Sequence, residues 1–309
     1  MFNEIAALYA HHLALFAASV FLLSLLVGSF LNVVIYRVPL MLEREWREQA
    51  AALVAVPSSG DPAGGAKPAA AAPFNLLVPR SACPSCGAQI SAWHNIPVLS
   101  WLMLRGRCAA CKARISPRYP LVELVTALLS AWVACRFGFG WSAACGLLIT
   151  WSLIALTGID IDHQLLPDNI TLPLLWSGLL ASVLLGAGAA APFPVAPATA
   201  IIGAAAGYLS LWLVFHVFKL VTGKEGMGYG DFKLFAALGA WLGWKSLPLI
   251  ILLSAATGAV VGITMILAKG RDRSQPMPFG PYLAAAGWLA MMYGESIIGG
   301  YLRVSGLSR

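Results

Sequence analysis

Charged residues are scarce in this 309-residue chain, where Asp, Glu, Lys and Arg together make up only 11% of the sequence. Soluble domains contain roughly 25% of these residues, so the composition argues against a soluble globular protein. Apolar residues make up 59% of the chain and occur in uninterrupted runs, without the alternation of membrane β-barrel strands. Because about 20 consecutive apolar residues span a bilayer as a helix, the sequence predicts an all-α polytopic membrane protein.

The apolar runs predict eight transmembrane helices. The first run has no Lys or Arg before it and no convincing small-residue cleavage site, so we interpret it as a retained span rather than a signal peptide. The predicted spans are 13–35, 121–137, 141–159, 170–189, 199–217, 232–244, 247–268 and 282–299. They divide the chain into a first span (1–35), a loop domain (36–119) and a seven-span membrane domain (120–309).

Basic residues are distributed unevenly between the two sides of the predicted bundle. Sixteen of the 20 Lys and Arg residues lie in the loops 36–119, 219–233 and 269–273, which alternating spans place on one side. Cytoplasmic loops carry such an excess, so we expect these loops in the cytoplasm and the N-terminus outside. The net charge of +7 is therefore interpreted as an orientation signal and not as a nucleic-acid-binding surface.

The long loop contains two segments of unusual composition. Residues 42–52 (LEREWREQAAA) form a charge-rich amphipathic pattern, which predicts a short helix on the membrane surface. Residues 56–73 are rich in Ala, Pro and Gly. Such a composition cannot bury a core, so this segment is predicted to be a flexible insertion.

Four of the six cysteines form two CxxC pairs in the same loop. Cys83 and Cys86 are separated from Cys108 and Cys111 by 21 residues. This spacing is typical of a four-thiolate zinc site, and a site with four protein ligands has a structural role. Two disulfides are the alternative, but cytoplasmic thiols stay reduced, so zinc is favoured.

Four aspartates lie at the predicted cytoplasmic face. Asp160, Asp162 and Asp168 follow the third span, and Asp231 precedes the sixth. Ionisable groups near hydrocarbon are costly and usually functional. Two adjacent carboxylates cannot both ionise easily, so one holds a proton while the other is charged. The charged group can deprotonate an attacking water and the protonated group can donate to the leaving amine, as in an aspartic protease.

Each aspartate also has a simpler interpretation. Asp231 could cap the helix that follows it, and the other three could make turn or cap contacts. Gly228 and Gly230 could be loop punctuation, or could let an extended substrate backbone approach Asp231 closely because they have no side chain. Spacing alone leaves Asp162 and Asp168 as rivals to Asp160.

The motifs resemble those of the type IV prepilin peptidases, the prepilin leader peptidase/N-methyltransferases. Gly228-Tyr-Gly-Asp231 looks like the GxGD motif of intramembrane aspartic proteases. The resemblance covers nearly the whole chain and includes the segments 28–39, 94–101, 116–123, 160–168, 219–226 and 278–282. The insertion at 56–73 departs from the family pattern but leaves every motif intact.

The resemblance implies a function for these motifs. It makes Asp160 and Asp231 the catalytic pair and gives Asp162 and Asp168 a secondary place. The family cleaves the short basic leader of prepilins and type II secretion pseudopilins after a glycine, at the cytoplasmic face of the bacterial inner membrane. It then methylates the new N-terminal residue with S-adenosylmethionine, an activity associated with the cysteine-containing loop. No glycine-rich fingerprint in the loop identifies the methyl-donor site.

Two functions of other classes use the same features. Intramembrane acids also mark ion pathways, but a transporter would place them near the midplane of inverted repeats, and here they cluster at one face. A membrane scaffold that docks an assembly machine through the zinc loop would need the cysteines but not the aspartates.

Overall fold

The computed structural model describes residues 2–54, 74–186, 193–269 and 277–306, and the predicted insertion at 56–73 lies outside them. The described residues form helices joined by loops, with two isolated β-bridges and no named strand. The helices are α1 (Phe2–His11), α2 (Leu13–Val54), η1 (Ala92–Asn95), α3 (Leu99–Met103), α4 (Arg118–Phe137), α5 (Trp141–His163), α6 (Asp168–Leu185), α7 (Pro197–Thr222), α8 (Tyr229–Leu242), η2 (Trp244–Ser246), α9 (Leu247–Lys269) and α10 (Gly280–Val304).

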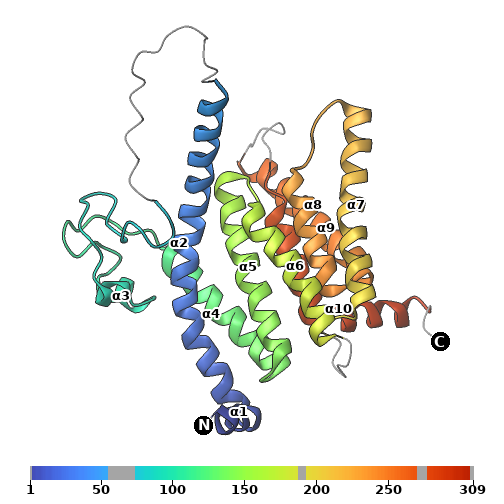
Figure 1. The fold of residues 1–309 in the computed structure, drawn as a ribbon, viewed down its shortest axis with the longest axis horizontal. Helices are drawn as coiled ribbons and strands as arrows, with labels where there is room; N and C mark the ends of the chain where they lie inside the picture. The colour runs from blue at the N-terminus through green and yellow to red at the C-terminus, as the bar shows by residue number, and fades with distance from the viewer. Residues whose placement is uncertain (1, 55–73, 187–192, 270–276, 307–309) are drawn as a thin grey trace.

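Six described helical segments are long and apolar enough to cross a membrane: α2, α4, α5, α6, α7, and α9 with η2. The predicted class, an all-α polytopic membrane protein, is confirmed. The eight predicted spans correspond to these six candidates and to α8 and α10, which also belong to the bundle. α5 ends, and α6, α8 and α10 begin, toward the same end of that bundle (Figure 1).

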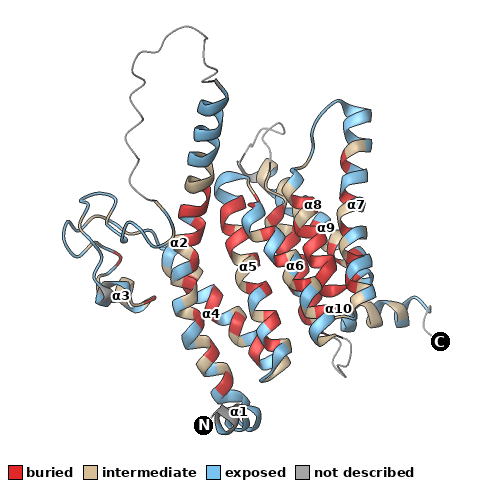
Figure 2. Cartoon of the chain, in the orientation of Figure 1, coloured by how far each residue is buried: buried red, intermediate tan, exposed pale blue. Residues whose placement is uncertain are grey.

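The centre of the bundle is α8, which packs against α6, α7 and α10. Every residue from Asp231 to Leu242 except Lys233 is buried, and the ribbon of this helix is mostly red (Figure 2). α7 approaches α8 backbone to backbone, because a Cβ on Gly203 would collide with the carbonyl oxygen of Gly239. Small residues at such crossings allow helices to pack closely in membranes, and this contact fixes α8 in the protein interior.

The first span is longer than the sequence predicts. It does not end at residue 35 but continues as α2 for 42 residues, about 63 Å at the α-helical rise. The hydrocarbon core of a bilayer is only about 30 Å thick, so α2 is too long to lie within it along its whole length. One end of α2 extends past the ends of α4 and α5 (Figure 1). Residues 42–52 belong to this extension, and the prediction of a separate surface helix was wrong. Pro39 lies inside the helix without ending it.

The part of α2 beyond residue 35 contacts the segment in which the loop domain returns to the bundle. The guanidinium of Arg37 is buried and donates to the carbonyl oxygens of Asn75, at 2.8 Å, and Pro79, at 2.6 Å. About two helical turns further along α2, the Cζ atom of Arg44 lies 4.0 Å from the centre of the Phe74 ring. Hydrogen bonds to a charged donor are stronger than neutral ones, so these contacts fix where the loop returns to the bundle.

Candidate active site

Asp231 lies in the first turn of α8 and is buried, with 7% of its surface exposed. Its Oδ2 accepts the backbone N–H of Gly228 at 3.2 Å, which caps the helix. One oxygen therefore makes a cap contact, but Asp231 is the third residue of α8 and not the residue that precedes the helix. The other, Oδ1, is buried and has no hydrogen-bond partner among the described residues. Buried polar atoms are rarely left unpaired, so capping does not account for the whole carboxyl group.

Asp160 lies in the last turn of α5 and is 5% exposed. Its Oδ2 accepts the backbone N–H of Gly280, the first residue of α10, at 3.0 Å. Its backbone carbonyl accepts the N–H of Gln164 at 2.9 Å, where α5 ends in a left-handed residue. Both the backbone and the side chain of Asp160 are thus held in place.

Three segments that are distant in sequence meet at these two aspartates. Leu166 is buried in the loop after α5 and contacts both Gly230 and Gly280: a Cβ on Gly230 would lie 2.6 Å from its Cβ, and one on Gly280 would lie 3.1 Å from its Cδ2. The structure therefore brings the two motifs together at one end of the bundle.

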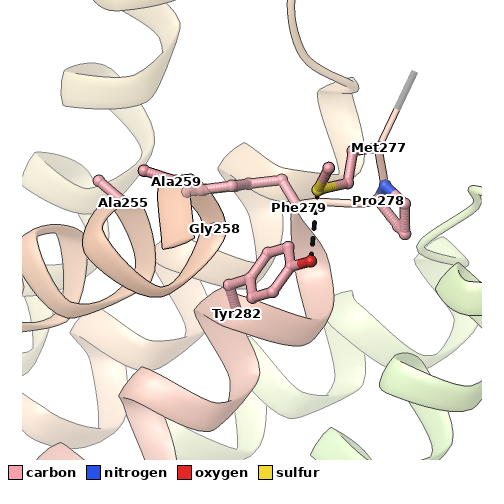
Figure 3. A pocket seen from close by; sticks show the side chains of 7 residues that line it. All are labelled: Ala255, Gly258, Ala259, Met277, Pro278, Phe279 and Tyr282. Carbon is pink, nitrogen blue, oxygen red and sulfur yellow. Dashed lines mark hydrogen bonds between the residues drawn. The ribbon is translucent and has the colours of Figure 1, made fainter. Parts of the chain in front are cut away.

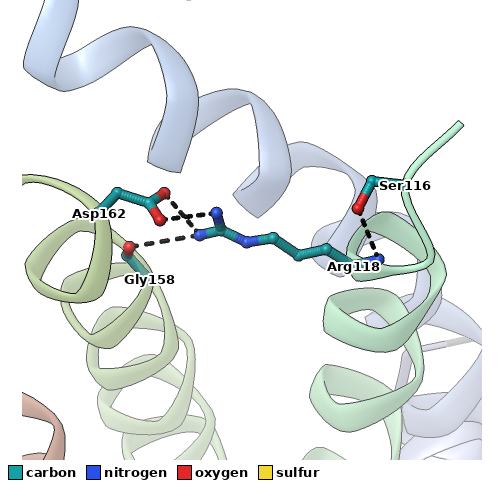
Figure 4. A network of polar contacts seen from close by, with 4 residues as sticks. All are labelled: Ser116, Arg118, Gly158 and Asp162. Carbon is teal, nitrogen blue, oxygen red and sulfur yellow. Dashed lines mark hydrogen bonds and ion pairs between the residues drawn. The ribbon is translucent and has the colours of Figure 1, made fainter. Parts of the chain in front are cut away.

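Asp162 has a different partner and binds Arg118 at the start of α4. Both of its carboxylate oxygens lie 2.7 Å from guanidinium nitrogens of Arg118. The same guanidinium also donates to the carbonyl oxygen of Gly158 at 3.4 Å (Figure 4). A paired carboxylate of this kind connects α4 to the end of α5.

Asp168 is also paired, as the first residue of α6. The ammonium group of Lys233, two residues after Asp231, lies 2.6 Å from Asp168 Oδ1 and 2.7 Å from Oδ2. This ion pair connects the start of α6 to the start of α8. Two of the four sequence candidates therefore have ion-pair partners, while Asp160 and Asp231 have only backbone donors among the described residues.

The two glycines of the Gly-Tyr-Gly-Asp turn have different surroundings. Leu166 already occupies the side of Gly230 where a side chain would lie. Gly228 is exposed, and a Cβ there would approach nothing closer than Asp231 Oδ2 at 3.6 Å. Space for an approaching backbone is thus present at Gly228 rather than at Gly230.

Gly280 is a site residue to which the sequence analysis assigned no role. A Cβ on it would lie 2.6 Å from Asp160 Oδ2, closer than such atoms approach in real structures. Only glycine lets its N–H reach the carboxylate this closely. The signal was present in the segment 278–282 (PFGPY), where the glycine lies between Pro278 and Pro281, the second of which is in the first turn of α10.

The four cysteines come together in two similar turns of the loop domain. In each turn the backbone N–H of the first cysteine donates to the carbonyl oxygen of the residue five positions later. The pairs are Cys83 with Ala88 and Cys108 with Ala113. An isolated β-bridge closes each turn, and the residue after the second cysteine has a positive φ: 71° at Gly87 and 59° at Lys112. The repeated geometry directs two thiols from each turn to one place.

All four sulfur atoms lie within 4.8 Å of one another. The cysteines are free, and the sulfurs of Cys83 and Cys111 are 3.8 Å apart, so the disulfide alternative is not what the structure contains. The backbone N–H groups of Ser85 and Cys86 lower the pKa of Cys83 to about 6. Thiolates in a compact set of four fit a tetrahedral metal ion such as zinc.

Comparison with known proteins accounts for both halves of the chain. The family model of the bacterial peptidase A24 N-terminal domain matches residues 22–137, and that of the type IV leader peptidase family matches residues 147–263. No solved structure matches the chain.

Close relatives extend over almost the full length. A prepilin leader peptidase/N-methyltransferase of Aeromonas hydrophila is 56% identical, over 93% of this chain and 94% of its own. Proteins of the same name are 54% identical in Stutzerimonas stutzeri, over 94% and 96%, and 52% identical in Pseudomonas aeruginosa, over 96% and 97%. The similarity includes both aspartate segments and the cysteine loop, and the chain belongs to the type IV leader peptidase family, with the prepilin leader peptidase/N-methyltransferases as its relatives.

Proposed function

We propose that the chain is an aspartic endopeptidase that removes the leader peptide of prepilins and pseudopilins after a glycine and then N-methylates the new N-terminal residue. The observation that carries the proposal is the buried pair Asp160 and Asp231. Each has one oxygen held by a backbone N–H, and Asp231 Oδ1 has no partner in the described protein. These anchors fix the carboxyl groups while leaving an oxygen for a reactant.

The chemistry follows from two carboxyl groups that share one proton. The ionised carboxylate takes a proton from water as the water oxygen attacks the scissile carbonyl carbon. The protonated carboxyl group donates to the amine as the C–N bond breaks, so the pair exchanges roles during the reaction. Backbone N–H groups that point at carboxylate oxygens cost no reorganisation during catalysis. Exposed Gly228 offers space for the substrate backbone beside Asp231.

The cysteine set completes the proposal for the loop domain. Cys83, Cys86, Cys108 and Cys111 would hold one zinc ion, which would stabilise the fold of a loop that has little core of its own. S-adenosylmethionine is the proposed methyl donor on the strength of the relatives' names. No contact residue for it is assigned.

The proposed location is the bacterial inner membrane, with the N-terminus in the periplasm and the aspartates at the cytoplasmic face. The asymmetry of Lys and Arg supports this orientation. The ion pairs that Arg118 and Lys233 form beside the aspartates place basic side chains at the same end of the bundle. Membrane lipid and the prepilin substrates are the proposed partners, with no nucleic acid.

The test is incubation of purified protein with a prepilin and S-adenosylmethionine, followed by mass spectrometry of the new N-terminus. Asp160→Asn and Asp231→Asn should each reduce cleavage by about 10²–10⁴-fold, the usual contribution of a general acid or base, while both variants remain inserted. Full cleavage by both variants would refute the assignment. Ion flux into liposomes that either substitution abolishes would favour a transporter instead. Loss of function in cysteine variants alone would favour a scaffold.

A further inference from the structure

A cavity of about 220 Å³ lies between α9 and the beginning of α10. Its lining consists of Ala255, Gly258 and Ala259 on α9, and of Met277, Pro278, Phe279 and Tyr282 at the start of α10 (Figure 3). None of these side chains is charged. The one polar side-chain group is the Tyr282 hydroxyl, which donates to the sulfur of Met277 at 3.3 Å. The cavity is therefore suited to an apolar group.

The beginning of α10 connects this cavity to the carboxyl group of Asp160. Phe279 forms part of its wall, and the next residue, Gly280, donates its N–H to Asp160 Oδ2 at 3.0 Å. The carbonyl oxygen of Phe279 accepts the N–H groups of Tyr282 and Leu283, each at 3.1 Å. One helical turn thus carries both the cavity wall and the contact to Asp160, so a group in the cavity is held at a fixed position relative to that carboxylate.

The size and opening of the cavity limit what can occupy it. Pockets for drug-sized ligands measure roughly 300–1,000 Å³, whereas about 220 Å³ suits a single large side chain. Ala255 and Ala259 are exposed on α9, a candidate membrane span. An occupant can therefore enter from the apolar surroundings of the bundle, as a side chain on a membrane-embedded substrate would.

We propose that the cavity binds the apolar side chain of the substrate residue that follows the scissile bond. This inference rests on the proposed function, in which a glycine precedes that bond. Glycine has no side chain to place, so a side-chain cavity connected to Asp160 through Phe279 and Gly280 serves the residue on the other side of the bond. The cavity then determines which residue can become the new N-terminus.

The test fills the cavity and measures selectivity rather than activity alone. Ala259→Leu adds apolar volume at the rim, and Ala256→Leu is the matched control, because Ala256 is exposed on the same helix but does not line the cavity. Each protein is given two prepilins that differ only in the residue after the glycine, Phe or Ala. We expect Ala259→Leu to lower the Phe/Ala ratio of kcat/KM by about tenfold or more, and the control to leave it unchanged.

A second variant guards against misfolding of the first. A Cβ on Gly258 would lie 3.4 Å from the Tyr282 ring, an ordinary contact, so Gly258→Ala narrows the cavity without a collision and should shift the ratio in the same direction. An unchanged Phe/Ala ratio in both cavity variants would overturn the inference and leave a lipid chain as the occupant. Failure of the unaltered protein to cleave either prepilin would instead refute the proposed function, and this inference with it.

Discussion

The carboxylate of Glu123 accepts the backbone N–H of Val98 at 2.7 Å and thereby joins the loop domain to the membrane bundle. Glu123 is buried in α4, and Val98 has an unusual backbone conformation with φ 60° and ψ −51°. A β-branched residue with positive φ is a genuine outlier. Such strain persists only where the surroundings hold it, and Glu123 supplies that restraint.

Removal of this carboxylate should loosen the loop domain. Glu123→Ala leaves the Val98 N–H without its acceptor, which costs about 1–3 kcal/mol. We expect a lower unfolding temperature in detergent and faster limited proteolysis between α3 and α4. Glu123→Gln is the matched control, because its amide oxygen can still accept the hydrogen bond. Equal proteolysis rates for the two variants would show that the contact contributes nothing.

Substitution of Gly280 should impair catalysis without preventing insertion. The added Cβ of Gly280→Ala would displace Asp160 Oδ2, from which it would lie only 2.6 Å away. A misplacement of this order reduces rates by about 10²-fold, and we expect such a loss in prepilin cleavage. Gly299→Ala is the control on the same helix, because a Cβ there meets nothing within 4 Å. Normal cleavage by Gly280→Ala would contradict the proposed position of Asp160.

The ion-paired aspartates should tolerate neutralisation. Exposed ion pairs contribute about 0.2–1 kcal/mol, and both Asp162 and Asp168 have partly exposed side chains. We therefore expect Asp162→Asn and Asp168→Asn each to retain cleavage within tenfold of the unaltered protein, as measured with the same prepilin. A loss as large as that of Asp160→Asn would move the assignment to the paired residue.

The cysteine quartet should bind about one zinc ion per chain. Metal analysis of freshly reduced protein should detect it, and Cys86→Ser with Cys111→Ser should remove it. Cys135→Ser is the control, since this free cysteine does not belong to the cluster. Because zinc binds thiolates, protons compete for the ligands, and zinc affinity should fall as the pH is lowered toward about 6, the pKa of Cys83. Absence of zinc at neutral pH would refute the site.

The sequence predicts the helices of this protein better than it predicts their contacts. Continuous apolar runs identify the membrane helices, and the CxxC spacing identifies the thiol cluster, because both patterns are local. The partners of Asp162 and Asp168 lie 44 and 65 residues away in sequence, and nothing local distinguishes a paired carboxylate from a free one. The choice of Asp160 over its neighbours therefore depended on family resemblance.

The length of α2 shows a different limit. The sequence predicts that the first span ends at residue 35, and exposed charged residues follow it from Arg44 to Glu48. They do not end the helix, because Glu, Arg, Gln and Ala are all good helix formers. Hydropathy reflects what surrounds a helix, whereas the length of a helix depends on its backbone. The predicted boundary at residue 35 and the observed end at Val54 are 19 residues apart, in a helix of 42 residues.

Because other helices enclose α8, its position should not depend on the thickness of the membrane. A lipid-facing helix must match the thickness of its bilayer, and it tilts or distorts when the two differ. α8 has 14 residues, about 21 Å of helix, and its neighbours separate it from lipid. Its length is therefore free of hydrophobic matching, and the depth of Asp231 is set by the protein and not by lipid composition.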